Sequence, residues 1–286
     1  MIETANPVAA KPAIDLDEQA LRLKHAALLW FLGVLGGVAV MPYALALQAD
    51  MLRPLLEKQG LTLFKVGLIG VFQTAVLVLL AVPLGLWAAR RVGWKAPLSE
   101  ALLRRQPVPA WVREGIWSAV VLGTFSGAAI VVLDLAVFLP RIPKLQAINR
   151  TFAEHAPLSS GVLACLYGAI TEELLLRLFV MSLIALLLKT LLRNNQPVVG
   201  PVIMWLANVG AALLFGIGHL PAAKLLLPLT PLLIGRTLLL NGIVGVLCGW
   251  LYAKRGLELA MLAHGCADVV LHVIVPLLVL SGLLSL

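Results

Sequence analysis

Charged residues are scarce in this sequence of 286 residues, because Asp, Glu, Lys and Arg together make up only 13% of it. In soluble proteins, these charged residues make up about 25% of the sequence. Hydrophobic residues account for 61%, and the mean hydropathy is +0.99. The lack of charge excludes an ordinary soluble domain, and most of the charge that remains lies between apolar runs long enough to cross a bilayer. The sequence therefore predicts an all-α fold, a polytopic integral membrane bundle of helices.

Cysteine is also rare, and the three cysteines, Cys165, Cys248 and Cys266, fall inside apolar runs. An odd number without short spacing argues against a disulfide framework, so we interpret them as small packing residues. The sequence contains no phosphate-binding glycine loop and no solenoid-type repeat. The net charge of +8 is explained by basic loops beside a membrane, so we expect no nucleic-acid partner.

Long apolar runs are what the sequence does contain. We predict spans at residues 26–47, 66–89, 115–139, 158–192, 202–219, 231–252 and 257–286. The fourth run has 35 residues, more than a bilayer needs, so it is either one tilted helix or two segments with a break. Seven or eight transmembrane helices both fit. We divide the chain into a flexible tail (1–23), N-terminal transmembrane helices (24–157) and a transmembrane core (158–286).

Basic residues predict the orientation of the chain. The segment 90–114 carries six Lys or Arg, against three in each of the segments 48–65 and 139–157. The positive-inside rule places segment 90–114, and with it the N-terminus, in the cytoplasm. The first long apolar run begins only after Lys24, which is unlike a cleavable signal peptide. We expect a bacterial inner (cytoplasmic) membrane protein.

Acidic residues are fewest in the last three-fifths of the chain, where only six follow Gly115. Three of them, Glu172, Glu173 and Asp268, are flanked by apolar turns on both sides. Ionisable groups inside a membrane cost about 2.5 to 3.5 kcal/mol each on insertion scales and usually mark a functional site. We interpret His272 as structural. No role is assigned to the isolated polar residues Asp134, Asn208, Lys224 and Arg236.

Helical spacing separates the two adjacent glutamates. Glu173 and Arg177 are four residues apart and share one helix face, where they can pair. Glu172 points about 100° away and stays free for chemistry. A carboxylate in apolar surroundings that binds a water molecule is a good general base near neutral pH.

Two later helices carry further polar groups at the same spacing. Phe215 precedes His219 by one turn, and His264 precedes Asp268 by one turn. If these helices converge on Glu172, His219 can hold the attacking water. His264 and Asp268 can then stabilise the oxyanion that forms when water attacks a peptide carbonyl.

The three motifs, in this order, resemble those of the CPBP intramembrane proteases, which include the type II CAAX prenyl endopeptidases and many bacterial members. The pattern EExxxR is matched by residues 172–177, FxxxH by residues 215–219 and HxxxN/D by residues 264–268. Each motif alone is a weak signal, but together they are a strong one. The resemblance covers roughly residues 158–270, so it concerns the core rather than the first 150 residues.

The resemblance implies a glutamate-dependent endopeptidase with the catalytic residues Glu172, Glu173, Arg177, His219, His264 and Asp268. Glu172 would activate water, with Glu173 and Arg177 in support. Family members with Asn at the last position have a neutral oxyanion donor, so Asp268 would have to be protonated or paired with His264. We prefer a mechanism that requires no cofactor. The alternative is zinc held by Glu172, His219 and His264.

The expected partners are the lipid bilayer and a membrane-associated peptide or protein substrate. The basic net charge and the compact architecture suggest a secreted peptide, a lipoprotein-like tail or a bacteriocin as the substrate, rather than a prenylated protein. One alternative is a non-catalytic immunity or partner-binding protein that retains the protease fold. A proton-coupled transporter would show inverted repeats, and the sequence contains no convincing pair.

Overall fold

The structure is a computed structural model that describes residues 16–284. The first 15 residues of the predicted tail lie outside the described residues. Within the described part, every regular element is a helix, and seven stretches are long and apolar enough to span a membrane. They are Leu16–Gln48, Leu63–Val92, Ala110–Arg141, Leu158–Leu191, Pro201–Leu226, Pro231–Arg255 and Leu257–Leu280. The protein is a polytopic helical membrane protein, and the long fourth run is one continuous span.

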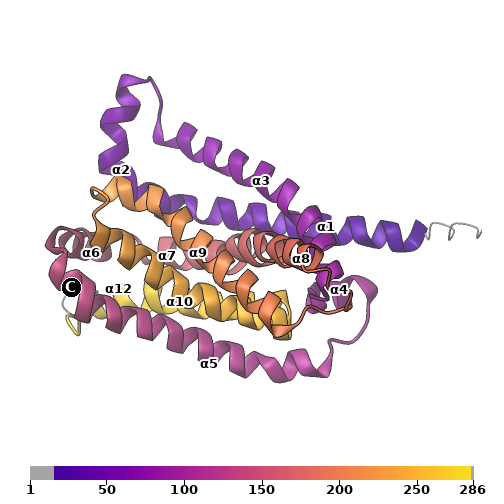
Figure 1. Cartoon of the computed structure of the whole chain (residues 1–286). Coiled ribbons are helices and arrows are strands. Elements are labelled where there is room, and N and C mark those ends of the chain that lie inside the picture. Colours follow the sequence, from indigo (N-terminus) through magenta and orange to yellow (C-terminus); the bar gives the residue numbers. More distant parts are fainter. Residues whose placement is uncertain (1–15, 285–286) are drawn as a thin grey trace, which may run out of the picture.

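The first half of the chain forms three of these spans (Figure 1). The helix α1 runs the length of the bundle, and α2 turns away from it before α3 returns. The short helix α4 covers the end at which α1 begins. The elements are α1 (Leu16–Ala39), α2 (Met41–Lys58), α3 (Leu63–Val92), α4 (Pro97–Arg104), α5 (Ala110–Leu133), the π-helical turn η1 (Asp134–Phe138), the 3-10 turn η2 (Leu139–Arg141) and α6 (Pro143–His155).

The second half forms the other four spans, and the first and last of them contain π-helical segments. The elements are α7 (Leu158–Leu166), the π-helices η3 (Tyr167–Glu172) and η4 (Leu174–Met181), α8 (Ser182–Leu191), α9 (Pro201–Leu226), α10 (Pro231–Arg255), α11 (Leu257–Val269), the π-helix η5 (Val270–Ile274) and α12 (Val275–Leu280). Pro and Gly residues separate the spans, because Pro favours the first turn of a helix and Gly ends one.

Local sequence fixes the ends of two long helices. The Thr62 hydroxyl accepts a hydrogen bond from the Lys65 N–H at 3.2 Å and caps α3, and Thr230 caps α10 through the Leu233 N–H at 3.2 Å. Such caps satisfy N–H groups that have no partner in the first turn. Gly93 ends α3 with φ = 84°, in the left-handed region that glycine adopts without strain.

Large apolar side chains cover the outside of the bundle. Phe72, Trp117, Phe125 and Val202 are each at least 69% exposed. Lipid tails are the solvent that suits such a surface. Inside, α5 crosses α11 so closely that a Cβ on Gly123 would overlap the Ala263 backbone. Glycine at this position therefore brings α5 against the helix that carries His264.

Two predicted boundaries differ from the structure. Residues 16–23, predicted as part of the tail, are the first turns of α1. The predicted span at 202–219 is too short, because α9 continues to Leu226. His219 therefore lies inside the helix rather than at its end. The predicted division of the chain into N-terminal helices and a core stays a prediction.

Candidate active site

The two glutamates lie where the fourth span leaves regular α-helical geometry. Glu172 is the last residue of η3, Glu173 lies between the two π-helices, and Arg177 lies in η4. π-Helical turns inside α-helices are rare and are frequent at functional sites. In η3, the Thr171 hydroxyl donates to the Gly33 carbonyl at 2.8 Å, so this segment is also tied to α1.

Glu173 and Arg177 form the ion pair that their spacing predicts. Both side chains are buried, at 0% and 1% exposed, and Arg177 Nε lies 3.3 Å from Glu173 Oε2. The other carboxylate oxygen, Oε1, lies 2.7 Å from His264 Nδ1, within hydrogen-bonding distance. The Arg177 guanidinium also donates to the Gly245 carbonyl at 3.3 Å and lies over the Phe215 ring, 5.2 Å from its centroid. Glu173 thus ties the fourth span to α11 and holds the His264 ring in one orientation.

Glu172 faces the other way, toward two imidazoles. Its Oε1 lies 3.8 Å from His219 Nε2, and its Oε2 lies 3.6 Å from His264 Nε2. The glutamate side chain is 15% exposed, and that of His219 is 37% exposed. Both distances are longer than a direct hydrogen bond. The facing atoms of all three side chains are therefore available to a water molecule or a substrate.

The orientation of His219 comes from its own helix. Its Nδ1 lies 3.0 Å from the Phe215 carbonyl, one turn earlier in α9, and the two rings meet edge to face at 4.7 Å. Phe215 also contacts the His264 ring, with centroids 5.8 Å apart. The aromatic residue of the FxxxH motif therefore packs between both imidazoles. This arrangement turns His219 Nε2 toward Glu172.

Asp268 completes the cluster from α11. Its Oδ1 lies 3.7 Å from His264 Nε2, and its side chain is 10% exposed. A Cβ on Gly168 would overlap Asp268 Oδ2 and lie 3.3 Å from His264 Nε2. Only a glycine in η3 allows this close approach. Sequence reasoning did not identify Gly168, although it lies four residues before Glu172.

Two groups of side chains near the glutamates could offer ligands to a metal ion. Among the described residues, Glu173, Cys248 and His264 have ligand atoms that all lie within 4.8 Å of one another. This set suits a cation poorly, because Glu173 and His264 are already bonded to each other and the Arg177 guanidinium lies beside them. The set of Glu172, His219 and His264 suits a metal cation better. In this set, His264 Nε2 faces Glu172. The other ring nitrogen, Nδ1, lies within hydrogen-bonding distance of the Glu173 carboxylate, an arrangement found in many metal-bound histidines.

Three polar residues outside the predicted catalytic set have partners elsewhere in the bundle. The His272 Nδ1 lies 3.0 Å from the Tyr43 hydroxyl, which ties η5 to α2. Asp134 of η1 accepts two hydrogen bonds from Arg236 of α10, at 2.7 and 2.5 Å. Sequence reasoning did not pair these last two charges. The signal was available, since both are isolated in apolar spans and opposite in sign.

Comparison with protein families agrees with the motifs. Residues 154–270 match the family described as type II CAAX prenyl endopeptidase Rce1-like. The matched stretch contains all three motifs and the helices that carry them, and residues 1–153 lie outside it. No curated protein and no solved structure matches the chain. The match implies a protease. Residues 154–270 are thus similar to the type II CAAX prenyl endopeptidases, which supports the resemblance to the CPBP intramembrane proteases.

Proposed function

We propose that this protein is an intramembrane endopeptidase in which Glu172 activates the water that hydrolyses a peptide bond. The observation that carries the proposal is the position of the Glu172 carboxylate. One of its oxygens lies 3.8 Å from His219 Nε2 and the other 3.6 Å from His264 Nε2. A carboxylate between two imidazoles, with no direct hydrogen bond to either, suits a general base that holds water.

The reaction follows from these roles. A water held by Glu172 and His219 attacks the carbonyl carbon of the scissile bond, and its proton passes to the Glu172 carboxylate. The carbonyl oxygen becomes an oxyanion. The C–N bond then breaks, and the proton on Glu172 passes to the departing amine. The products are a carboxylic acid, which then loses its proton to the solvent, and an amine, and Glu172 returns to its ionised form.

The oxyanion needs a donor, and His264 is best placed to supply one. The Glu173 carboxylate 2.7 Å from Nδ1 stabilises a positively charged ring, whose Nε2–H can donate. Asp268 lies on the same side, 3.7 Å from this nitrogen. Asp268 acts here in its protonated form, because an ionised carboxylate would repel the oxyanion.

The substrate we propose is a membrane-associated peptide or protein. The described residues contain no strand and no extramembrane domain built from long helices, so selection falls to the intramembrane cavity and the lipid. We further propose a bacterial inner membrane location with a cytoplasmic N-terminus, in line with the basic segment at 90–114. Secreted peptides, lipoprotein-like tails and bacteriocins are the substrates that suit this location.

Comparison of wild type with Glu172→Gln tests the proposal. The peptide termini in membrane and secreted fractions would be determined by mass spectrometry at matched expression. We expect termini that depend on the wild-type protein to fall by about 10²-fold or more in the variant, as for loss of a general base. Glu154→Gln is the control, because Glu154 belongs to an exposed pair with Arg150 and such pairs contribute little.

The other outcomes are informative too. If Glu172→Gln leaves all termini and the cellular phenotype unchanged, the protease proposal fails, and a non-catalytic immunity or partner-binding role takes its place. A purified enzyme whose cleavage is lost with a zinc chelator and restored by zinc would replace the metal-free mechanism with the set of Glu172, His219 and His264.

A further inference from the structure

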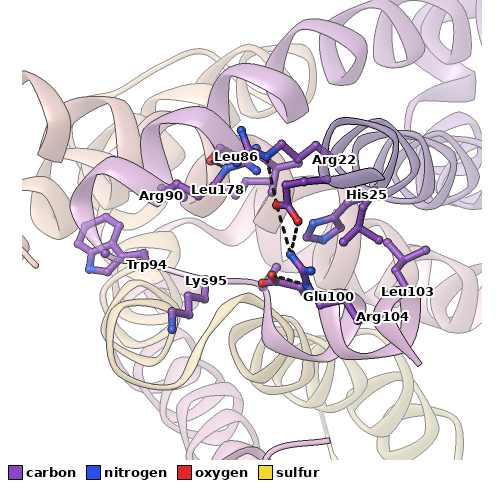
Figure 2. Close-up of a pocket in the computed structure, with 15 residues that line it drawn as sticks. Arg22, His25, Leu86, Arg90, Trp94, Lys95, Glu100, Leu103, Arg104 and Leu178 are labelled. Atoms are coloured by element: carbon purple, nitrogen blue, oxygen red, sulfur yellow. Dashed lines mark hydrogen bonds and ion pairs between the residues drawn. The ribbon is translucent and has the colours of Figure 1, made fainter. Parts of the chain in front are cut away.

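A second polar site lies outside the active site, at the end of the bundle where α1 begins (Figure 2). It is a cavity of about 240 Å³ between α1, α3 and α4, which we call the α1–α4 cavity. Four basic and two acidic side chains line it, a formal excess of two positive charges. They are Arg22, Arg90, Lys95, Arg104, Glu18 and Glu100.

The two carboxylates are occupied by two of the four cations. Arg104 pairs with Glu18 at 3.0 Å and with Glu100 at 3.1 Å, and Arg22 also lies 3.3 Å from Glu18. These are the dashed contacts in Figure 2. They connect α1 to α4 across the cavity. The positive charge in excess therefore belongs to the other two cations.

Arg90 and Lys95 are those two cations. Among residues 16–284, no carboxylate lies within 4.0 Å of either of them. The Arg90 Nε donates to the Leu86 carbonyl at 3.0 Å, which fixes the guanidinium at the wall of the cavity. Glu18 and Glu100 still act on Arg90 electrostatically, but the lining keeps an excess of positive charge, and such a cavity attracts an anion.

The residues around the cavity are those expected at the level of the lipid headgroups. Trp87 stacks under the Arg91 guanidinium at 4.1 Å, and Trp111 is 38% exposed at the start of α5. Tryptophan and basic residues gather where a membrane meets water. The basic segment 90–114 folds over the same end. Basic pockets at this depth bind anionic headgroups.

We propose that the α1–α4 cavity binds a phosphate group, with Arg90 at its wall as the main ligand and Lys95 adding positive charge from the rim. Two sources can present this group: an anionic phospholipid of the adjacent leaflet, and a soluble phosphate compound. The guanidinium and the ammonium group each carry one positive charge, which suits the phosphate oxygens of either source. Neither cation contacts the active-site cluster, so this site is independent of the proposed protease mechanism.

Binding at this site would stabilise the contact of α4 with α11. The Ser99 N–H and hydroxyl of α4 both donate to Glu258 Oε1, at 2.9 and 2.8 Å. The Ser99 hydroxyl also lies 2.8 Å from His25 Nε2, and His25 lines the cavity. Glu258 lies in the first turn of α11, the helix that carries His264. A phosphate group that holds α1, α3 and α4 together should therefore raise the unfolding temperature of the protein.

Thermal unfolding of the full chain in neutral detergent tests the site. Short-chain phosphatidylglycerol, phosphatidylcholine and inorganic phosphate would each be titrated. We expect phosphatidylglycerol to raise the unfolding temperature of the wild type more than phosphatidylcholine does. The double variant Arg90→Gln/Lys95→Gln should weaken the apparent affinity about tenfold or more. Arg113→Gln, in the same basic segment but outside the cavity lining, is the matched control and should bind like the wild type.

A variant that is expected to strengthen binding tests the proposal even if the double variant does not fold. Glu100→Gln removes one carboxylate and frees part of Arg104, so it should tighten binding. Protection by inorganic phosphate alone, lost in the double variant, would assign the site to soluble phosphate compounds. The proposal would be overturned if Glu100→Gln binds phosphatidylglycerol with the same affinity as the wild type, and the double variant, where it folds, does so too.

Discussion

At the scale of single residues, Asp268 is the residue that most sharply tests the oxyanion site. Asp268→Asn keeps the side-chain shape and supplies a neutral N–H donor, so we expect cleavage to stay within about tenfold of the wild type. Asp268→Leu removes the donor, so cleavage should fall about 100-fold. At alkaline pH the Asn variant should lose less activity than the wild type, since an amide cannot ionise and repel the oxyanion.

The measurement is the rate of peptide cleavage against pH for the wild type and both variants. Equal unfolding temperatures would show that a loss is chemical rather than structural. If Asp268→Asn abolishes cleavage while the fold is intact, Asp268 transfers a proton or binds a cation instead of donating to an oxyanion.

Much of the geometry of the site follows from residue spacing, and the remainder does not. Spacing within one helix predicts that Glu173 meets Arg177 and that His264 lies near Asp268, and both are seen. The Glu173 to His264 contact and the approach of Gly168 to Asp268 join different spans. A single sequence fixes the faces of each helix but not which faces meet.

At the scale of elements, the Asp134–Arg236 pair fastens η1 to α10. Two hydrogen bonds join the side chains, which are 13% and 20% exposed. Arg236→Gln leaves the Asp134 carboxylate without its cation in an apolar span. We expect the free energy of unfolding to fall by about 3 kcal/mol, the lower end for a broken buried pair.

The matched control is the double variant Asp134→Asn/Arg236→Gln, which removes both charges. It should recover part of the lost stability, because no uncompensated charge remains. Unfolding free energies in a mixed-detergent titration would measure both. A double variant less stable than Arg236→Gln alone would contradict this account and make the geometry of the pair, rather than its charge, the stabilising factor.

Hydropathy predicts the existence of the spans better than their ends. All seven were found, yet α9 extends past Lys224 to Leu226, and α1 begins in a polar stretch at Leu16. The reason is physical. Hydropathy reports the thickness of hydrocarbon that a segment can cross, whereas helical hydrogen bonds continue into the headgroup region and beyond it. The π-helical geometry of η3 and η4 was likewise not predicted from the sequence.

At the scale of the whole molecule, the odd number of spans places the two ends of the described chain on opposite sides. The start of α1, α4 and the end of α8 lie together in Figure 1, and α2, α6 and α12 lie at the other end. Backbone hydrogen bonds tie the first set of connections together, from Val199 to Val92 at 3.1 Å and from Leu257 to Lys95 at 3.1 Å. Ten Lys or Arg lie in segments 90–114, 189–200 and 254–256, against seven in 48–65, 139–157 and 224–230. The charge bias thus favours the α1 end as cytoplasmic.

This orientation can be tested with two introduced cysteines. Asn195→Cys lies in the exposed connection between α8 and α9, and Gln59→Cys lies in the exposed connection between α2 and α3. In intact bacterial cells, a membrane-impermeant maleimide should label Gln59→Cys and should label Asn195→Cys only after permeabilisation. Wild-type protein, whose Cys165 and Cys248 are buried, sets the background. The reverse pattern would place segment 90–114 outside the cell. It would also move the α1–α4 cavity to the outer leaflet, because both lie at the same end of the bundle.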